Sequence, residues 1–411
     1  YQAALEVAHD PAMRRRIEIQ LADLDMQRSE AQLSDATIGQ SLFSGPINRY
    51  LQLLDADALG SEGNDRLLYQ LARAYDLDGQ QDQALLTLER LVEQHPDSTY
   101  YAEAQFRRGE LLFSQQRYAE AEGAYAAVID HGSSSPFYRN ALYLHGWSQF
   151  KQGAYLRSLE AFRQILDAMV PADGGIDELP RADKEMVLDT LRAVGLVFSY
   201  EQGAPTIERH FDQPQQERYL YLLYESLAAL YIEMERYGEA AEVYQYFVER
   251  HPAHERADEY SLLAIDAYTR GGFEQETVVA KQRFVDDFGV TSDYWAQADE
   301  DTRARLRPRL SEYLDQLARY EHARGLATDS ASAAGAHQAS LLRAAQGYEQ
   351  YVATAPDDSR AAEMIFLRGE ALYEAADFRG AVSAYETVAY QYRDQTYGAK
   401  AAYAAVLTYD R

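Results

Sequence analysis

The chain of 411 residues has no cysteine, only four lysines and no run of 18 uncharged apolar residues. Without cysteine, disulfide bonds, thiol catalysis and zinc–thiolate sites are excluded. Without a long apolar run, no transmembrane helix is predicted within these residues. The first residues, Tyr-Gln-Ala-Ala, carry no secretory signal, so a signal peptide or a lipid-attachment cysteine would lie outside this sequence.

Basic charge is also scarce, because 39 Lys and Arg face 66 Asp and Glu and leave a net charge of −27. A surface of this sign repels the phosphate backbone, so nucleic acid is a poor candidate partner. Two interpretations of the acidity remain open. One is an acidic groove for basic partners, and the other is the solvated surface of a protein from a GC-rich or salt-adapted organism.

Residues 67–166 contain three copies of one pattern, in phase at a spacing of 37 residues. Each copy consists of two amphipathic runs with helical periodicity, joined by a short polar turn such as Asp78-Gly79-Gln80. The first run carries a small residue at Ala72, Gly109 and Gly146, and the second carries one at Ala84, Ala121 and Ser158. These small residues predict a close approach of the two helices in each pair.

The pattern resembles the tetratricopeptide repeat (TPR), in which a large apolar residue, Gly or Ala, an aromatic residue, Ala, an aromatic residue and Pro recur over about 34 residues. The longer spacing, and His95-Pro96-Asp97-Ser98 before the next helix, are similar to bacterial periplasmic and outer-membrane TPR proteins. Those of the outer-membrane assembly machine and the Tol-Pal coordinator are of this type. The resemblance implies an all-α fold, a right-handed α-solenoid of TPR-like helix pairs with irregular insertions.

The places where the repeat pattern is regular, interrupted or resumed divide the chain into segments. We predict one or more degenerate helix pairs over 1–64, three regular TPRs over 65–166, an insertion or divergent repeat over 167–218, two TPRs over 219–290, and C-terminal TPRs over 291–411. The Ala/Ser-rich stretch Thr328 to Gly335 is predicted to be a flexible connector. Glu276 stands where a small residue is expected, which predicts looser packing there.

The last predicted helix, 401–409, is not polar, although natural arrays end in a polar capping helix. We therefore expect that the array continues beyond residue 411. The alternative is that a second copy of the chain covers the exposed face.

The resemblance to TPR proteins also predicts a binding surface, because their first helices line the concave face through positions five, nine and twelve of each repeat. An aromatic and charged groove of this kind would hold an extended or helical peptide. The competing interpretation is that these aromatic side chains pack against the next repeat. The residues transferred are Tyr69, Arg73, Asp76, Phe106, Glu110, Phe113, Tyr143, Trp147, Phe150, Glu225, Ile232, Phe366, Glu370 and Tyr373.

No pattern of catalytic chemistry stands out. The sequence has no Gly-rich phosphate loop, no Gly-x-Ser-x-Gly and no His-Glu-x-x-His. His251 and His254 form the one close histidine pair, and a zinc site would need further ligands within reach. We therefore predict no enzyme activity, no metal site and no cofactor.

The predicted function is a non-catalytic protein–protein interaction scaffold of the bacterial cell envelope. By resemblance, its partner would be a component of an envelope complex, and its location would be periplasmic, with outer-membrane anchoring through a part outside this sequence. Two alternatives stay open. One is a component of a polysaccharide export or cell-wall complex that contacts glycan, with Trp147 as first suspect, and the other is self-association through exposed repeat ends.

Overall fold

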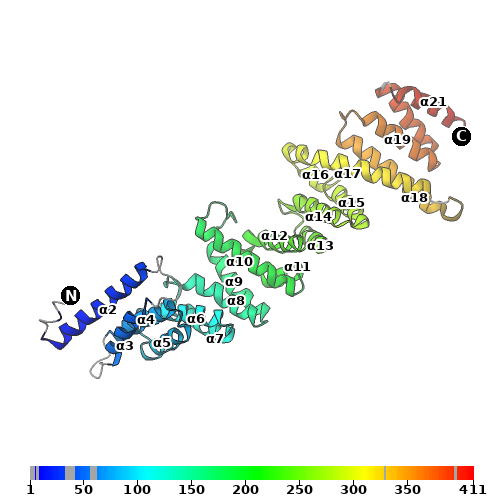
Figure 1. The fold of residues 1–411 in the computed structure, drawn as a ribbon. Helices are drawn as coiled ribbons and strands as arrows, with labels where there is room; N and C mark the ends of the chain where they lie inside the picture. The colour runs from blue at the N-terminus through cyan, green and yellow to red at the C-terminus, as the bar shows by residue number, and fades with distance from the viewer. Residues whose placement is uncertain (1–4, 6–8, 33–41, 56–62, 328–329, 393–395) are drawn as a thin grey trace. The chain divides into compact units, whose positions relative to one another are not determined.

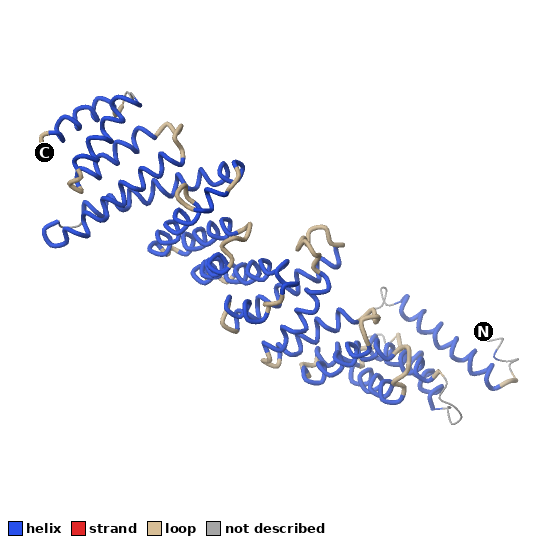
Figure 2. Tube along the Cα trace, turned by 180° about the vertical axis from the view of Figure 1, so that it is seen from behind, coloured by secondary structure: helices blue, strands red, loops and turns tan. Residues whose placement is uncertain are grey.

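The computed structural model describes residues 5, 9–32, 42–55, 63–327, 330–392 and 396–411. Over these ranges every regular element is a helix, and Figure 2 shows no strand among them. The predicted all-α class is confirmed, as is the solenoid of TPR-like helix pairs. The chain forms two compact units, 1–227 and 228–411.

The N-terminal unit consists of helix pairs that follow one another along the chain (Figure 1). Helix α2 packs against α3, and α3 packs against α4. Three pairs of similar length follow, and their first helices start 37 residues apart, as the sequence pattern predicts. The helices are α2 (Pro11–Gln32), α3 (Ser44–Asp55), α4 (Asn64–Leu77), α5 (Gln81–Gln94), α6 (Tyr101–Ser114), α7 (Tyr118–His131), α8 (Tyr138–Lys151) and α9 (Tyr155–Met169).

The small residue of the first helix lies at the crossing point of each pair. A Cβ atom added to Gly109 would stand 2.5 Å from Cε1 of Tyr125, and one added to Gly146 would stand 2.7 Å from Cε1 of Phe162. Real side chains do not approach so closely, so the aromatic ring of the second helix occupies the space that a side chain would fill. The predicted close approach is confirmed at these positions.

The segment after α9 retains one full helix of a repeat. Helix α10 (Arg181–Tyr200) packs against α9, and only the short α11 (Ala204–His210) follows it before η2 (Pro214–Gln216) and α12 (Glu217–Glu233). The Ser226 hydroxyl donates to the Leu191 carbonyl at 2.6 Å, next to Gly195. Helix α10 thus packs on the preceding helix α9, as α6 packs on α5, and the insertion or divergent repeat over 167–218 stays a prediction.

The C-terminal unit contains further pairs and one long hairpin. Helix α17 packs along α18, α18 packs against α19, and α20 continues as the π-helix η3. The elements are α13 (Tyr237–Arg250), α14 (Ala257–Gly271), α15 (Glu274–Phe288), α16 (Asp293–Gln297), α17 (Glu300–Ala327), α18 (Ser330–Thr354), α19 (Ala361–Glu374), α20 (Phe378–Glu386), η3 (Thr387–Tyr392) and α21 (Gly398–Tyr409).

The predicted flexible connector at Thr328 to Gly335 is wrong from Ser330 onward. Residues 328–329 lie outside the described ranges, but helix α18 starts at Ser330 and runs through the rest of the Ala/Ser-rich stretch. Alanine has the highest helix propensity of all residues, so an Ala-rich run extends a helix that is packed further along. Low complexity was therefore a misleading signal here.

The register of α15 differs from that of the other second helices. It starts ten residues after Ala264, whereas α7 starts nine residues after Gly109, because α14 extends two residues further past the small residue than α6 does and the turn that follows is one residue shorter. Glu276 consequently faces solvent, and Thr277 takes the buried place with 9% of its surface exposed. The predicted misfit of Glu276 is therefore avoided by a one-residue shift.

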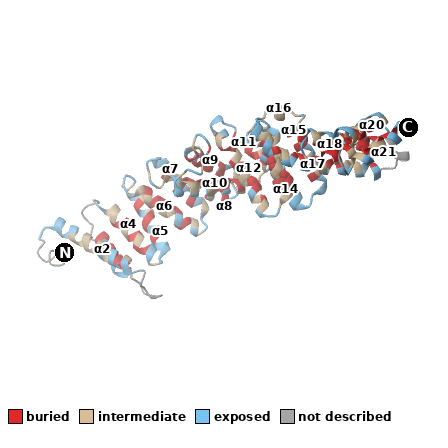
Figure 3. Cartoon of the chain, turned by 90° about the horizontal axis from the view of Figure 1, so that it is seen from above, coloured by how far each residue is buried: buried red, intermediate tan, exposed pale blue. Residues whose placement is uncertain are grey.

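Tyrosine dominates the largest fully buried side chains. Figure 3 shows that buried residues occur along the helices from α4 to α20. Several of these tyrosines donate their hydroxyl to a carboxylate, as Tyr219 does to Asp167 at 2.6 Å and Tyr50 does to Asp23 at 2.9 Å. Burial, reinforced by the acceptor carboxylate, raises the pKa of both tyrosines. They therefore remain protonated donors, and each bond satisfies a polar group that would otherwise be costly to bury.

Candidate partner-binding groove

The aromatic residues at the fifth position are used mainly to join repeats. Tyr69 and Phe106 each stack on a residue just before the next first helix, with ring centroids 4.8 Å apart for Tyr69 and Tyr100 and 5.3 Å apart for Phe106 and Phe137. Tyr69 and Phe106 are only 6% and 8% exposed. Phe366 lies 5.4 Å from Tyr397 in the same way. The structure thus places these predicted site residues in packing between repeats.

The aromatic residues at the twelfth position close the turn inside each pair. Phe113 lies 5.1 Å from Tyr118, and Tyr373 lies 5.5 Å from Phe378, the first residue of the following helix. Phe150 contacts Tyr155 at 5.0 Å and is 9% exposed. These contacts support the competing interpretation, in which the side chains pack within the array.

Tyr143 and Trp147 belong to an aromatic cluster over α9. Trp147 meets Phe150 and Phe162 edge to face, with interplanar angles of 72° and 73°, and meets Tyr143 at 76°. Lys151 Nζ lies 6.0 Å from the Trp147 ring centroid. Both Tyr143 and Trp147 remain half-buried, so part of each stays accessible. Their rings stand across one another and do not form the flat platform on which a sugar ring stacks.

The charged residues, in contrast, converge on a groove between the first helices α4 and α6. This first-helix groove has a volume of about 200 Å³. Arg73 and Asp76 of α4 lie on one side, and Arg107 and Glu110 of α6 lie on the other. Ala72, Ala84, Leu88 and Leu111 supply its apolar lining, with Gln81 and Ser114 completing it.

The two arginines of the first-helix groove are already paired, whereas the two acids are not. Arg73 Nη2 lies 2.6 Å from Glu30 Oε1 on α2, and Arg107 Nη2 lies 2.8 Å from Glu103 Oε1. Asp76 and Glu110 are exposed, and neither has an ion-pair partner within the described residues. Partial desolvation, reinforced by the charge of Asp76, raises the pKa of Glu110 against the opposing effect of Arg107. The groove therefore presents net negative potential to a ligand.

The remaining predicted residues have other surroundings. Glu370 accepts a hydrogen bond from the Tyr385 hydroxyl at 2.5 Å, which ties α19 to α20. Glu225 and Ile232 lie half-buried on α12. The positional rule missed Arg107 and the apolar floor. A signal for the floor was present, since Leu88 stands where the neighbouring repeats have Tyr125 and Phe162.

The described ranges hold neither a candidate metal cluster nor a candidate membrane span. No three His, Asp or Glu side chains there converge in a way that could hold a metal ion. No helix there has both the length and the apolar character needed to cross a membrane.

Comparison with known proteins identifies the repeats. Models of the tetratricopeptide repeat match residues 66–98 and 106–173, so this part of the chain consists of tetratricopeptide repeats. The comparison with curated proteins gives no match.

One similar solved structure is the C-terminal part of a TPR repeat-containing protein from Cytophaga hutchinsonii. Its sequence is 12% identical, the match covers 82% of this chain and 98% of that one, and the TM-score is 0.33. A tetratricopeptide repeat protein from Parabacteroides merdae is 13% identical, with coverage of 85% and 99% at a TM-score of 0.32. At such TM-scores the repeat assignment depends on the two sequence matches and on the helix packing described above.

Proposed function

We propose that this repeat chain is a non-catalytic scaffold of the bacterial cell envelope, which holds an extended basic segment of a partner protein in the first-helix groove. The observation that carries the proposal is the pair of exposed, unpaired acids, Asp76 and Glu110, on either side of an apolar floor. The helices that present them are fixed by the buried aromatic stacks, so little ordering is needed on binding. Tetratricopeptide repeats generally mediate protein–protein interactions, which agrees with this role.

A peptide suits the first-helix groove better than a glycan does. Its walls are charged and its floor is apolar, which fits an extended chain with alternating basic and small side chains. The rings that contact Trp147 itself meet it edge to face, so Trp147 does not form a coplanar surface with them for a sugar.

The envelope location is proposed from the elongated 37-residue repeat and its resemblance to periplasmic and outer-membrane TPR proteins, and the partner would belong to an envelope complex. Fractionation of cells that make the full-length protein tests it. Recovery with the periplasm or the outer membrane is expected, and recovery with the cytosol alone would contradict the proposal.

Neutralising the two acids is expected to weaken binding of a labelled (Lys-Ala)5 peptide about tenfold in the Asp76→Asn/Glu110→Gln variant. Two exposed ion pairs, each worth about 0.2–1 kcal/mol, would be lost. Fluorescence anisotropy at low and high salt measures the effect, and the difference should shrink at high salt. Because its pKa is raised, Glu110 becomes protonated at a higher pH than an ordinary glutamate does. On acidification, peptide binding to the wild type should therefore start to weaken at a higher pH than it would with an unperturbed glutamate.

The matched control is Glu93→Gln/Asp97→Asn, which removes two exposed acids that do not line the first-helix groove. This variant should bind like the wild type. Equal weakening in both variants would show that only net charge matters and would overturn the proposed site.

A second candidate function, self-association, is favoured by the exposed face of α21. Tyr403, Val406, Leu407 and Tyr409 are 68%, 62%, 50% and 65% exposed on this one helix. Apolar side chains gathered in this way are typical of interaction surfaces. The partner we propose for this face is a second copy of the chain.

Sedimentation velocity at several concentrations tests self-association. The wild type is expected to show a concentration-dependent rise in sedimentation coefficient, and Val406→Asp/Leu407→Asp should abolish that rise. Met13→Asp, which alters another exposed apolar residue, should leave it unchanged. A wild-type chain that stays monomeric at all concentrations would rule this function out.

A further inference from the structure

Three repeats share one aromatic arrangement around the crossing point of the helix pair. An aromatic residue three positions before the glycine packs against an aromatic residue sixteen positions after it. Ring centroids are 5.9 Å apart for Phe106 and Tyr125, 6.1 Å for Tyr143 and Phe162, and 5.7 Å for Phe366 and Tyr385. The glycines that these rings cover are Gly109, Gly146 and Gly369.

The pair α14/α15 lacks both rings. Three positions before Ala264 stands Ser261, and the place of the second ring falls on Ala280 by spacing or on Lys281 with the one-residue shift of α15, none of which is aromatic. The stacking partner that precedes the next first helix is missing as well, because Ser292 stands where Phe137 and Tyr397 stand in other repeats. No aromatic side chain therefore occupies any of these three places in this repeat.

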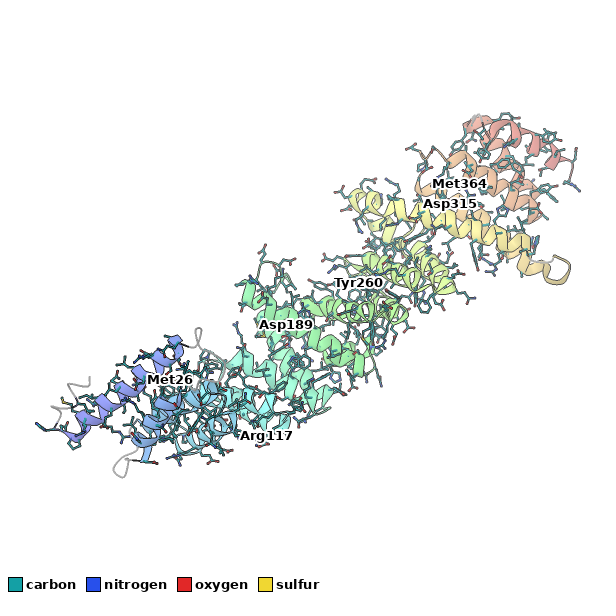
Figure 4. All side chains as sticks on the ribbon, viewed as in Figure 1. Met26, Arg117, Asp189, Tyr260, Asp315 and Met364 are labelled. Atoms are coloured by element: carbon teal, nitrogen blue, oxygen red, sulfur yellow. The ribbon has the colours of Figure 1, made fainter. Side chains whose placement is uncertain are left out.

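The space left by these replacements is open. A pocket of about 610 Å³ is lined by Ser261, Ala264 and Ala280. Its walls also include Val248, Pro252, Phe288 and Tyr294, and the last two meet edge to face at 4.9 Å. Tyr260 of α14, which is labelled in Figure 4 and precedes Ser261 in the sequence, is fully buried and packs on Phe247 at 4.7 Å, so the neighbouring core is intact. We call this space the α14/α15 pocket.

The rim of the α14/α15 pocket is charged unevenly. Arg283 Nη1 lies 2.6 Å from Glu249 Oε1, so that cation is paired. Asp287 also lines the pocket and has no ion-pair partner in the described part of the chain. Partial desolvation, together with the neighbouring charge of Asp286, raises the pKa of Asp287, and Arg283 opposes this. An unpaired acid beside an apolar hole suits a ligand that carries both a ring and a positive charge.

We propose that the α14/α15 pocket binds an aromatic side chain of a partner polypeptide that is flanked by lysine or arginine. The partner's ring would take the place of the rings that this repeat lacks, and the flanking cation would pair with Asp287. The site is separate from the first-helix groove, because its walls come largely from the second helices α13 and α15 and not from α4 and α6. The proposal therefore stands or falls independently of that groove.

Binding of short capped peptides, followed through the methyl NMR signals of Val248, Ala264 and Ala280 in the intact chain, tests this proposal. The probe is Gly-Lys-Phe-Lys-Gly, and the comparison peptides have Ala in place of Phe or Glu in place of Lys. The Phe peptide should give saturable shifts, and both comparison peptides should bind at least about tenfold more weakly, since one cannot bury a ring and the other opposes Asp287. No saturable shift with the Phe peptide, or equal shifts with the Ala peptide, would overturn the proposal.

Filling the pocket from within provides the matched variants. Ala280→Phe restores the ring of the second helix and Ser261→Phe restores that of the first, so one remains informative if the other misfolds. Each should keep or raise the melting temperature and reduce the Phe-peptide shifts at least about tenfold. Asp287→Asn should remove the preference for Lys over Glu while ring binding persists, and Asp76→Asn/Glu110→Gln should change nothing. A filled variant that folds and still binds normally would contradict the assigned site.

Discussion

Replacing Phe162 with alanine is expected to destabilise the N-terminal unit by about 3–5 kcal/mol. The ring is fully buried and lies over Gly146, so its removal leaves a cavity at the crossing point of α8 and α9. The backbone at Gly146 has no side chain with which to fill that cavity. Urea unfolding measures the loss through Trp147, whose ring lies 6.2 Å from Phe162, in a Trp295→Phe background.

The matched control is Leu156→Ala on the same helix. Leu156 is 44% exposed, so its replacement should lower the free energy of unfolding by no more than about 1 kcal/mol. A similar small loss for Phe162→Ala would show that the ring does not fix the crossing of the helix pair.

Replacing Arg305 with alanine is expected to destabilise the C-terminal unit by about 2–3 kcal/mol. Asp258, at the start of α14, is 1% exposed and forms an ion pair with Arg305 of α17. Without the guanidinium a buried carboxylate is left uncompensated, which is more costly than losing the pair as a whole. The expected loss is below that of a fully buried pair, because the Arg305 side chain is 53% exposed.

The test of this ion pair is a double variant. Arg305→Ala/Asp258→Asn removes the stranded charge and should recover most of the loss, as judged by urea unfolding followed through Trp295 in a Trp147→Phe background. Arg309→Ala, which breaks an exposed pair with Glu312, should cost at most about 1 kcal/mol. If the double variant were less stable than Arg305→Ala, burial of an unpaired charge would not be the cause.

The repeat framework could be predicted from the sequence because it depends on small residues at fixed spacing. Gly109 and Gly146 can occupy a crossing point only if another side chain fills the space above them, and the spacing of Tyr125 and Phe162 identifies that side chain. The Ala/Ser-rich stretch was harder to predict. Composition alone does not reveal that a packed helix continues through it.

The candidate site was only partly predictable. The position of Arg73 and Glu110 on the first-helix face follows from helical periodicity, and the structure brings both to one groove. The positions taken by the aromatic side chains do not follow from periodicity, because Phe106 and Phe366 pack on residues that precede the next first helix. Contacts of this kind between repeats depend on how successive pairs are placed, and the pattern of one repeat does not contain that information.

The central claim is that each repeat is held by its neighbours, so that the chain is a preformed surface for holding a partner. Hydrogen exchange of the Phe162→Ala variant, compared with the wild type by mass spectrometry, tests this most directly. Faster exchange should be confined to α8, α9 and the adjoining helices α7 and α10, while α4, α5 and α13–α15 keep wild-type protection. A uniform rise in exchange along the whole chain would mean one cooperative globule and would contradict the account.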